Sequence, residues 1–226
     1  MWKRIVPMLA IGIAAYGQSP ATLSGTVVDA ATNKPIARAF VSATATNLPP
    51  LRLTVQSASD GSFSFSQLPP GAYYLCLAPS AEGHLDPCVW SPPPATVNLA
   101  AGQNSSGYVL KAAPGAIITI HVADPQGLLQ QKTAAGVLPD FTLGVITPQT
   151  TLRPARQAAV SPSGIDYQVT IPFEADVVIS LKSFSLQIAD GGGAALADST
   201  ARQTVNQPSG ASSQLALTYS VTGLAQ

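Results

Sequence analysis

Residues 60–77 contain two alternating segments on either side of a Pro-Pro-Gly corner, and this pattern constrains the fold more than any other part of the chain. An Asp-Gly pair supplies a tight turn at the start, and the next segment alternates phenylalanine with serine. The two prolines disfavour a helix and cannot donate hydrogen bonds to a sheet. After them, Tyr73, Leu75 and Leu77 share one face of an extended segment. The pattern therefore predicts two strands of an antiparallel sandwich.

Two upstream segments, residues 23–29 and 34–43, complete a recognisable pattern. Together with residues 60–77, they resemble the carboxypeptidase regulatory-like domain, a transthyretin-like or prealbumin-like β-sandwich found as an accessory module in secreted bacterial proteins. The resemblance implies an all-β fold and a structural or interaction role. It implies no particular ligand.

The N-terminus has the features of a secretory signal peptide. Lys3 and Arg4 give it a positive start, and the apolar stretch 5–16 is shorter than the roughly 20 residues that a membrane-spanning helix needs. Small residues at positions 15 and 17 predict cleavage after residue 17. An uncleaved anchor is the alternative. We expect a secreted or periplasmic protein with no stable membrane span after cleavage.

The charge of the expected mature chain argues against nucleic-acid binding. Without Lys3 and Arg4, 9 of the 11 basic residues remain against 11 acidic residues, which gives a net charge of −2. Such a chain offers no basic stripe to neutralise phosphates. The expected partner is therefore an unknown protein or a glycan, and no nucleic acid.

An internal repeat indicates two domains. Its spacing is much longer than that of a solenoid repeat, so it predicts tandem Greek-key sandwiches. We expect a signal peptide at 1–17, a first sandwich at 18–113 and a second, divergent sandwich at 114–226. The matching pairs of segments are 21–29 with 116–124, 60–69 with 163–172, and 102–110 with 210–219.

The second copy departs from the family pattern because it lacks the Pro-Pro-Gly corner. Its additional strands are predicted at 140–147, 151–153 and 183–188. Residues 194–213 are rich in small and polar residues and predict a mobile loop. The junction near residues 112–115 is too short for a flexible tether, so the two sandwiches are expected to touch.

Cys76 and Cys88 are the only two cysteines, and in an exported chain an even number favours a disulfide. Two buried free thiols are the alternative. If Tyr73, Leu75 and Leu77 face the core, the side chain of Cys76 faces outward. The loop 79–90 is then expected to fold back over the outer face of the first sandwich.

This loop carries the candidate ligand-binding residues. Tyr74, His84 and Trp90 are expected to cluster on the outer face. In one hypothesis, Trp90 only covers that face as a lid. In the other, the aromatic side chains stack on a sugar while polar groups from the loop (Glu82, His84 and Asp86) fix its hydroxyls, as in carbohydrate-binding modules.

No catalytic, cofactor-binding or metal-binding residues are predicted. A zinc peptidase of the kind that carries the resembled domain needs two histidines and a glutamate, but His84 and His121 fall in different domains. No phosphate-cradling glycine loop or nucleophile elbow occurs. Asp29, Asp60 and Asp124 stand at strand ends or turns, where aspartate bonds nearby backbone. A hydrolase built from two of the carboxylates is the alternative to be tested.

Overall fold

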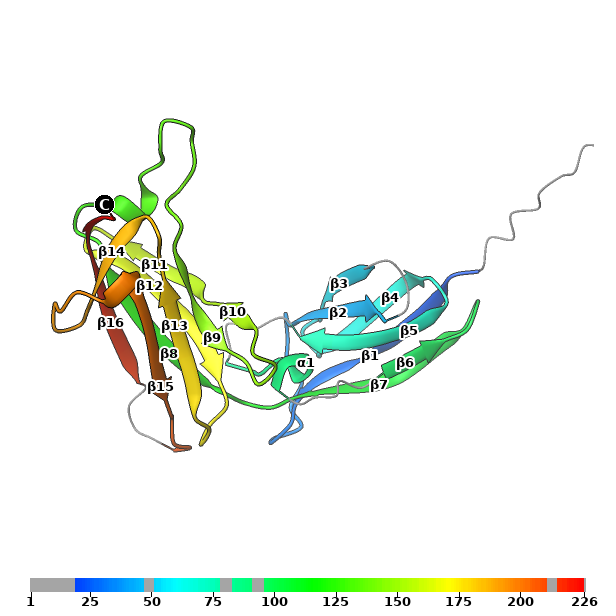
Figure 1. The fold of residues 1–226 in the computed structure, drawn as a ribbon. Helices are drawn as coiled ribbons and strands as arrows, with labels where there is room; N and C mark the ends of the chain where they lie inside the picture. Colours follow the sequence, from blue (N-terminus) through cyan, green and yellow to red (C-terminus); the bar gives the residue numbers. More distant parts are fainter. Residues whose placement is uncertain (1–18, 47–50, 78–82, 91–95, 211–214, 226) are drawn as a thin grey trace, which may run out of the picture.

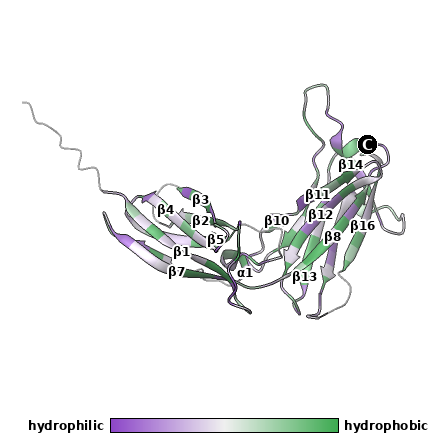
Figure 2. Cartoon of the chain, turned by 180° about the vertical axis from the view of Figure 1, so that it is seen from behind, coloured by the Kyte–Doolittle hydropathy of each residue, from purple (hydrophilic) through white to green (hydrophobic). Residues whose placement is uncertain are grey.

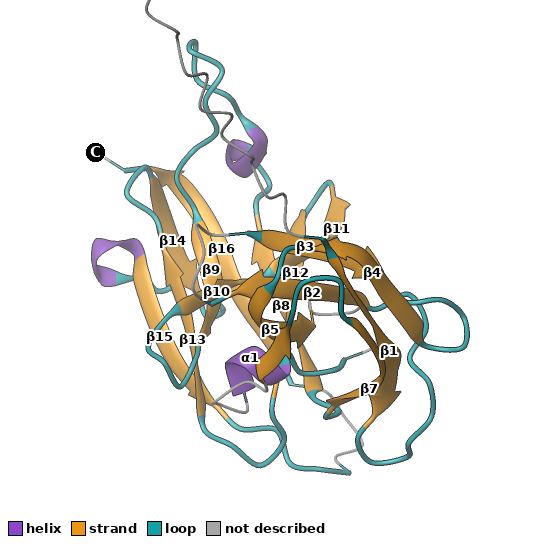
Figure 3. Cartoon of the chain, turned by 90° about the vertical axis from the view of Figure 1, so that its right-hand side faces the viewer, coloured by secondary structure: helices purple, strands orange, loops and turns teal. Residues whose placement is uncertain are grey.

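The computed structural model describes residues 19–46, 51–77, 83–90, 96–210 and 215–225. These residues form an all-β protein of two sandwiches arranged in tandem along the chain (Figure 1). In Figure 3 nearly everything is strand or loop, and the helical segments are single short turns. No helix in the described part of the chain has the length and apolar character that crossing a bilayer requires. The predicted signal peptide lies outside the described residues.

The first sandwich packs a three-stranded sheet of order β4-β1-β7 against a four-stranded sheet of order β3-β2-β5-β6. Strand β1 pairs antiparallel with β4 and parallel with β7. The strand bounds are β1 Ala21–Asp29, β2 Phe40–Ala45, β3 Arg52–Gln56, β4 Ser62–Leu68, β5 Gly71–Leu77, β6 Thr96–Leu99 and β7 Asn104–Ala112.

The alternation around the proline corner places residues as the sequence predicts. Phe63 and Phe65 of β4 are both buried, and their rings meet edge to face at 6.0 Å between centroids. Tyr73 of β5 is fully buried, and its hydroxyl donates a 2.6 Å hydrogen bond to the carbonyl oxygen of Pro69 in the corner. A buried tyrosine needs such a partner. The hydrogen bond ties the proline corner to the core of the first sandwich.

The second sandwich packs a five-stranded sheet of order β11-β12-β8-β16-β14 against a four-stranded sheet of order β10-β9-β13-β15. Hydrophobic residues gather along the strands of both sandwiches, including β8 and β13 (Figure 2). The bounds are β8 Ala116–Ala123, β9 Thr142–Ile146, β10 Leu152–Pro154, β11 Arg156–Ser161, β12 Gly164–Ile171, β13 Val177–Lys182, β14 Leu186–Asp190, β15 Thr200–Val205 and β16 Ala216–Leu224, with short 3-10 turns η1 Leu128–Gln130 and η2 Ala197–Ser199.

The internal repeat is visible in the strand pairing. In the first sandwich β1 pairs antiparallel with β4 and parallel with β7, and in the second β8 pairs antiparallel with β12 and parallel with β16. Likewise, β2 pairs antiparallel with β5, as β9 does with β13. The second sandwich is therefore a copy of the same pairing scheme with extra strands.

The prediction of a mobile loop at residues 194–213 is wrong for part of that segment. Thr200–Val205 forms strand β15, which pairs with β13 over its whole length. Its residues show no regular alternation of buried and exposed positions, and β15 lies at a sheet edge, paired on one side only. Strand β11, whose residues are all exposed, is likewise an edge strand that hydrophobic patterning does not reveal.

Candidate functional site

A disulfide fixes the segment 83–90, called here the anchored loop, to the first sandwich. Cys76 in β5 is bonded to Cys88, which lies in the single helical turn α1 Pro87–Trp90, and their Cα atoms are 5.3 Å apart. The alternation in β5 is as predicted: Leu75 is buried, Tyr74 is 37% exposed and Cys76 is partly buried. The predicted disulfide and its position on the outer face of β5 are confirmed.

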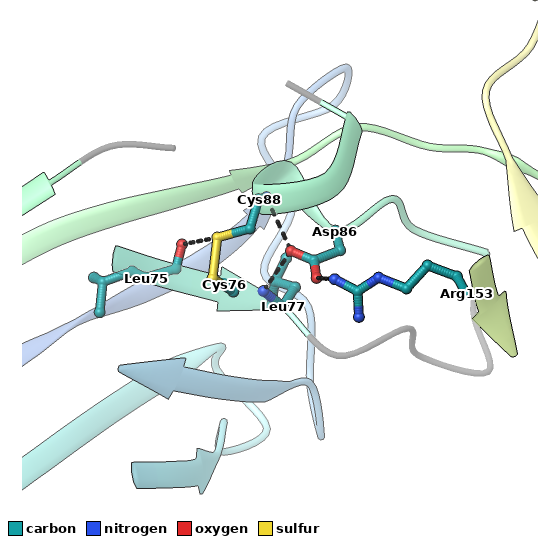
Figure 4. The surroundings of a disulfide bond; sticks show 6 residues. All are labelled: Leu75, Cys76, Leu77, Asp86, Cys88 and Arg153. Carbon is teal, nitrogen blue, oxygen red and sulfur yellow. Dashed lines mark hydrogen bonds and ion pairs between the residues drawn. A yellow bond between two sulfur atoms is a disulfide. The ribbon is translucent and has the colours of Figure 1, made fainter. Parts of the chain in front are cut away.

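Asp86 organises the anchored loop beside the disulfide (Figure 4). Its Oδ1 accepts hydrogen bonds from the backbone N–H groups of Leu77, at 3.2 Å, and Cys88, at 3.0 Å. Its Oδ2 lies 3.4 Å from a guanidinium nitrogen of Arg153 in the second sandwich. Asp86 is only 6% exposed, and this burial raises the pKa of its carboxyl, while the two N–H donors and Arg153 oppose the rise.

The anchored loop lies against β5 of the first sandwich, as predicted, and it also docks on the second sandwich. Trp90 packs against the core of the second sandwich, and Gln149 Nε2 donates a 3.1 Å hydrogen bond to the carbonyl oxygen of Val89. In Figure 1, α1 lies between the two sandwiches. The sequence predicts contact between the domains, but not that this loop makes it.

The linker between the sandwiches is itself paired with the anchored loop. Leu85 N–H donates to the carbonyl oxygen of Ala113 at 2.8 Å, and Gly115 N–H donates to that of Gly83 at 2.6 Å. The approach is close, because a Cβ added at Gly115 would lie 2.7 Å from both Leu85 Cδ2 and Ile171 O. The junction is therefore a short antiparallel pairing and not a tether.

The His84 side chain faces Asp29 of the first sandwich and does not join a cluster on the outer face. Its Nε2 donates a 3.0 Å hydrogen bond to Asp29 Oδ2, and its side chain is 14% exposed. Among the described aromatic side chains, no ring contact joins Tyr74 and Trp90. The structure thus brings His84 and Trp90 to the domain junction through the anchored loop, while Tyr74 stays on the exposed face of β5.

The hydrogen bonds to the Asp29 carboxylate contribute stability that depends on pH. The backbone N–H and hydroxyl of Thr32 donate to Asp29 Oδ1 at 2.7 and 2.9 Å, and these bonds, with lesser help from His84, lower the pKa of the carboxyl to about 2. The pKa of Asp29 in the folded protein is below its value of about 4 in the unfolded chain, so the unfolded state binds more protons at pH values between the two. The stabilisation that Asp29 contributes is therefore lost as the pH falls from about 4 to about 2.

We therefore expect Asp29→Asn to be destabilising at pH 6 and to have little further effect near pH 2. Urea unfolding of both proteins across this range measures the difference. Asp198→Asn, at one of the exposed aspartates of the second sandwich, is the control, and we expect it to change the stability by less than about 0.5 kcal/mol. An equal effect of Asp29→Asn at pH 6 and pH 2 would contradict the assignment.

A cavity of about 200 Å³ opens where the anchored loop meets the second sandwich. The loop contributes His84, Leu85, Asp86, Val89 and Trp90. Strands of both sheets of the second sandwich contribute the rest, including Ile117, Val145, Arg153, Arg156, Gln168 and Val169. Sequence reasoning missed the two arginines, because nothing in a strand pattern shows which side chains another domain will face.

The three aspartates predicted at strand ends and turns accept hydrogen bonds from nearby backbone, whereas Glu82 lies outside the described residues. Asp29 accepts bonds from the N–H groups of residues 31 and 32, Asp60 from that of Ser62, and Asp124 from those of Leu128 and Leu129. Their predicted role in turns is confirmed. Cys76, Asp86 and Cys88 place potential metal ligands within 4.8 Å of one another, but the two sulfurs are bonded together and supply no thiolate.

Comparison with protein families gives one match. The family described as the carboxypeptidase regulatory-like domain matches residues 22–86, which run from β1 to Asp86 of the anchored loop. No curated protein matches the sequence.

Solved structures similar to this chain have low sequence identity to it. The minor pilin GBS52 from Streptococcus agalactiae is 11% identical, with 91% of this chain and 97% of the pilin covered and a TM-score of 0.38. A putative carbohydrate binding protein from Bacteroides uniformis is 11% identical, with 83% and 99% covered and a TM-score of 0.31. The Bacillus anthracis TIE protein is 12% identical, with 91% of this chain covered and a TM-score of 0.35. The chain spans 34% of the length of the TIE protein and 62% of that of a Streptococcal ancillary pilin.

Proposed function

We propose that this protein is an exported, non-enzymatic structural or interaction module, because residues 22–86 match the carboxypeptidase regulatory-like domain family. In this proposal residues 1–17 are a signal peptide, and residues 18–113 and 114–226 are the two sandwich domains. The mature protein is secreted or periplasmic and binds an unidentified protein or glycan partner. The disulfide supports export, since such bonds persist in oxidising compartments.

The docking of the anchored loop carries the proposal. It joins the sandwiches by an ion pair from Asp86 to Arg153, a hydrogen bond to Val89 and the packing of Trp90 against the second core. These contacts act together with the paired linker, so the sandwiches move as one unit. A rigid two-domain unit suits a protein that holds a surface at a fixed distance or orientation.

The non-enzymatic part of the proposal is supported by how the carboxylates are used. The carboxylates of Asp29, Asp60, Asp86 and Asp124 each accept backbone N–H bonds that shape a turn or loop. A general acid or base must instead be available to a substrate. Turnover of peptide, ester or glycoside substrates by the purified protein, above that of a heat-treated sample, would contradict this part.

A variant that forces the two sandwiches apart at the linker tests whether they are held rigidly to each other. In Gly115→Ala the new methyl group meets Leu85 and the backbone of Ile171, so we expect a loss of about 1–3 kcal/mol and a larger radius of gyration by small-angle X-ray scattering. In the control Gly223→Ala, the nearest atom to the new Cβ is 3.6 Å away, and neither quantity should change. Wild-type scattering that requires many relative orientations of the sandwiches would overturn the proposal.

Carbohydrate binding is the second candidate function, and one observation favours it. Trp90, His84 and Asp86, three residues named for this role from the sequence, line the same cavity. If a glycan binds there, Trp90→Phe should weaken binding on a glycan array more than the outer-face change Tyr74→Phe. If Tyr74→Phe weakened glycan binding more than Trp90→Phe, the glycan site would lie on the outer face of β5 instead. If the wild type bound no glycan on the array, this candidate function would be wrong.

A further inference from the structure

The cavity at the domain junction has an apolar interior and a cationic mouth. Its buried walls are Leu85, Val89, Val145 and Val169, each at most 7% exposed. Of the other lining residues, Arg153 has a side chain that is 46% exposed, and Arg156 is exposed as well, so the arginines line the solvent-facing part of the cavity. A ligand that enters this cavity would therefore leave water with its apolar part and keep a polar group near the arginines.

The two guanidinium groups retain capacity for an anion. Arg153 makes a 3.4 Å contact with Asp86, and Arg156 donates a 2.7 Å bond to Gln168 Oε1. Each guanidinium has five N–H donors arranged to hold a carboxylate through two parallel bonds. These contacts keep the arginine side chains at the cavity.

Asp86 sets the orientation of such a ligand. Its carboxylate is only 6% exposed, contacts Arg153 at 3.4 Å and would repel a second anion placed beside it, which favours the solvent-exposed side of the two arginines for that anion. The anionic group of a ligand is therefore held at the mouth and the apolar end points inward. The volume of about 200 Å³ exceeds the 150 Å³ or so that accepts a benzene ring in an apolar cavity.

We propose that this cavity binds small carboxylic acids with an apolar, ring-sized body, such as an arylalkanoic acid. The acid's carboxylate pairs with Arg153 and Arg156 at the mouth, and its ring lies against Trp90 and the buried valines. This inference goes beyond the structural role proposed above and does not depend on carbohydrate binding.

Trp90 allows binding to be read directly. The chain has two tryptophans, so replacing Trp2 with phenylalanine in the full chain leaves Trp90 as the sole tryptophan fluorophore at the cavity. Titration with 3-phenylpropionate should shift its emission saturably, with a dissociation constant of about 0.1–1 mM, which is typical of ligands this small. The matched neutral probe, 3-phenylpropanamide, should bind about tenfold more weakly or worse because it lacks the charge.

Variants of the arginines locate the carboxylate. Arg156→Gln should weaken 3-phenylpropionate about tenfold and leave the amide unchanged, and Arg153→Gln should do the same. Arg202→Gln is the control, because Arg202 is exposed on β15 at the opposite sheet edge from β10. Thermal unfolding of each variant checks that the fold is kept. Equal affinity for acid and amide, tighter binding of glucuronate than of 3-phenylpropionate, unaltered affinity in both cavity variants, or no saturable signal would each overturn the proposal.

Discussion

Replacement of both cysteines, Cys76→Ser with Cys88→Ser, is expected to lower the free energy of unfolding of the first sandwich by about 3 kcal/mol. The bond closes a loop with a sequence separation of 12, and removing it restores that loop's freedom to the unfolded chain. It also releases α1, so part of the loss should come from looser docking on the second sandwich.

The two contributions can be separated by experiment. Denaturant unfolding followed by circular dichroism gives the stability, with each sandwich treated as its own transition where two are seen. Trp90 fluorescence, again in a Trp2→Phe background, reports docking. Reduction of the wild-type disulfide should reproduce both changes, which controls for effects of the serines. Unchanged stability after both treatments would show that the bond does not hold the loop.

Trp90→Ala is expected to cost about 2–3 kcal/mol, somewhat less than a fully buried tryptophan because the side chain is partly exposed. The ring packs against the core of the second sandwich although it belongs to a loop of the first. The loss should therefore appear mainly as earlier unfolding of the second sandwich and as weaker coupling between the two transitions.

Tyr74→Ala is the matched control for Trp90→Ala. Both remove an aromatic ring near the disulfide, but Tyr74 is 37% exposed on β5, and its loss should cost less than about 1 kcal/mol. If Tyr74→Ala cost as much as Trp90→Ala, the lid on the outer face of the first sandwich would be the better description. Comparable melting curves for Trp90→Ala and the wild type would contradict the docking.

The sequence was most informative where a residue's role depends on its immediate neighbours. Alternation in residues 60–77 correctly predicted which side chains of β4 and β5 are buried, because a strand has a period of two. The same alternation placed Cys76 on the outer face, where its disulfide with Cys88 lies. Asp29, Asp60 and Asp124 likewise bond backbone close to them in sequence.

Prediction failed where the partner is distant. Trp90 was expected beside Tyr74 but packs against the second sandwich. The sequence around an aromatic residue does not show which apolar surface will bury its ring. Arg153 and Arg156 lie on the edge strands β10 and β11, which have little hydrophobic pattern, and only the folded second sandwich brings them to the anchored loop. Strand β15 was missed because edge pairing with β13 stabilises it without an alternating face.

The parallel strand pairs determine how this chain would carry a mechanical load. Strand β1 pairs in parallel with β7, β7 continues through the linker into β8, and β8 pairs in parallel with β16. A pull on the two ends of the chain would draw β1 and β7, and likewise β8 and β16, in opposite directions along their lengths. In that geometry the hydrogen bonds of each ladder are loaded together in shear rather than opened one at a time. Tension between the termini would thus meet two such ladders in series, one in each sandwich.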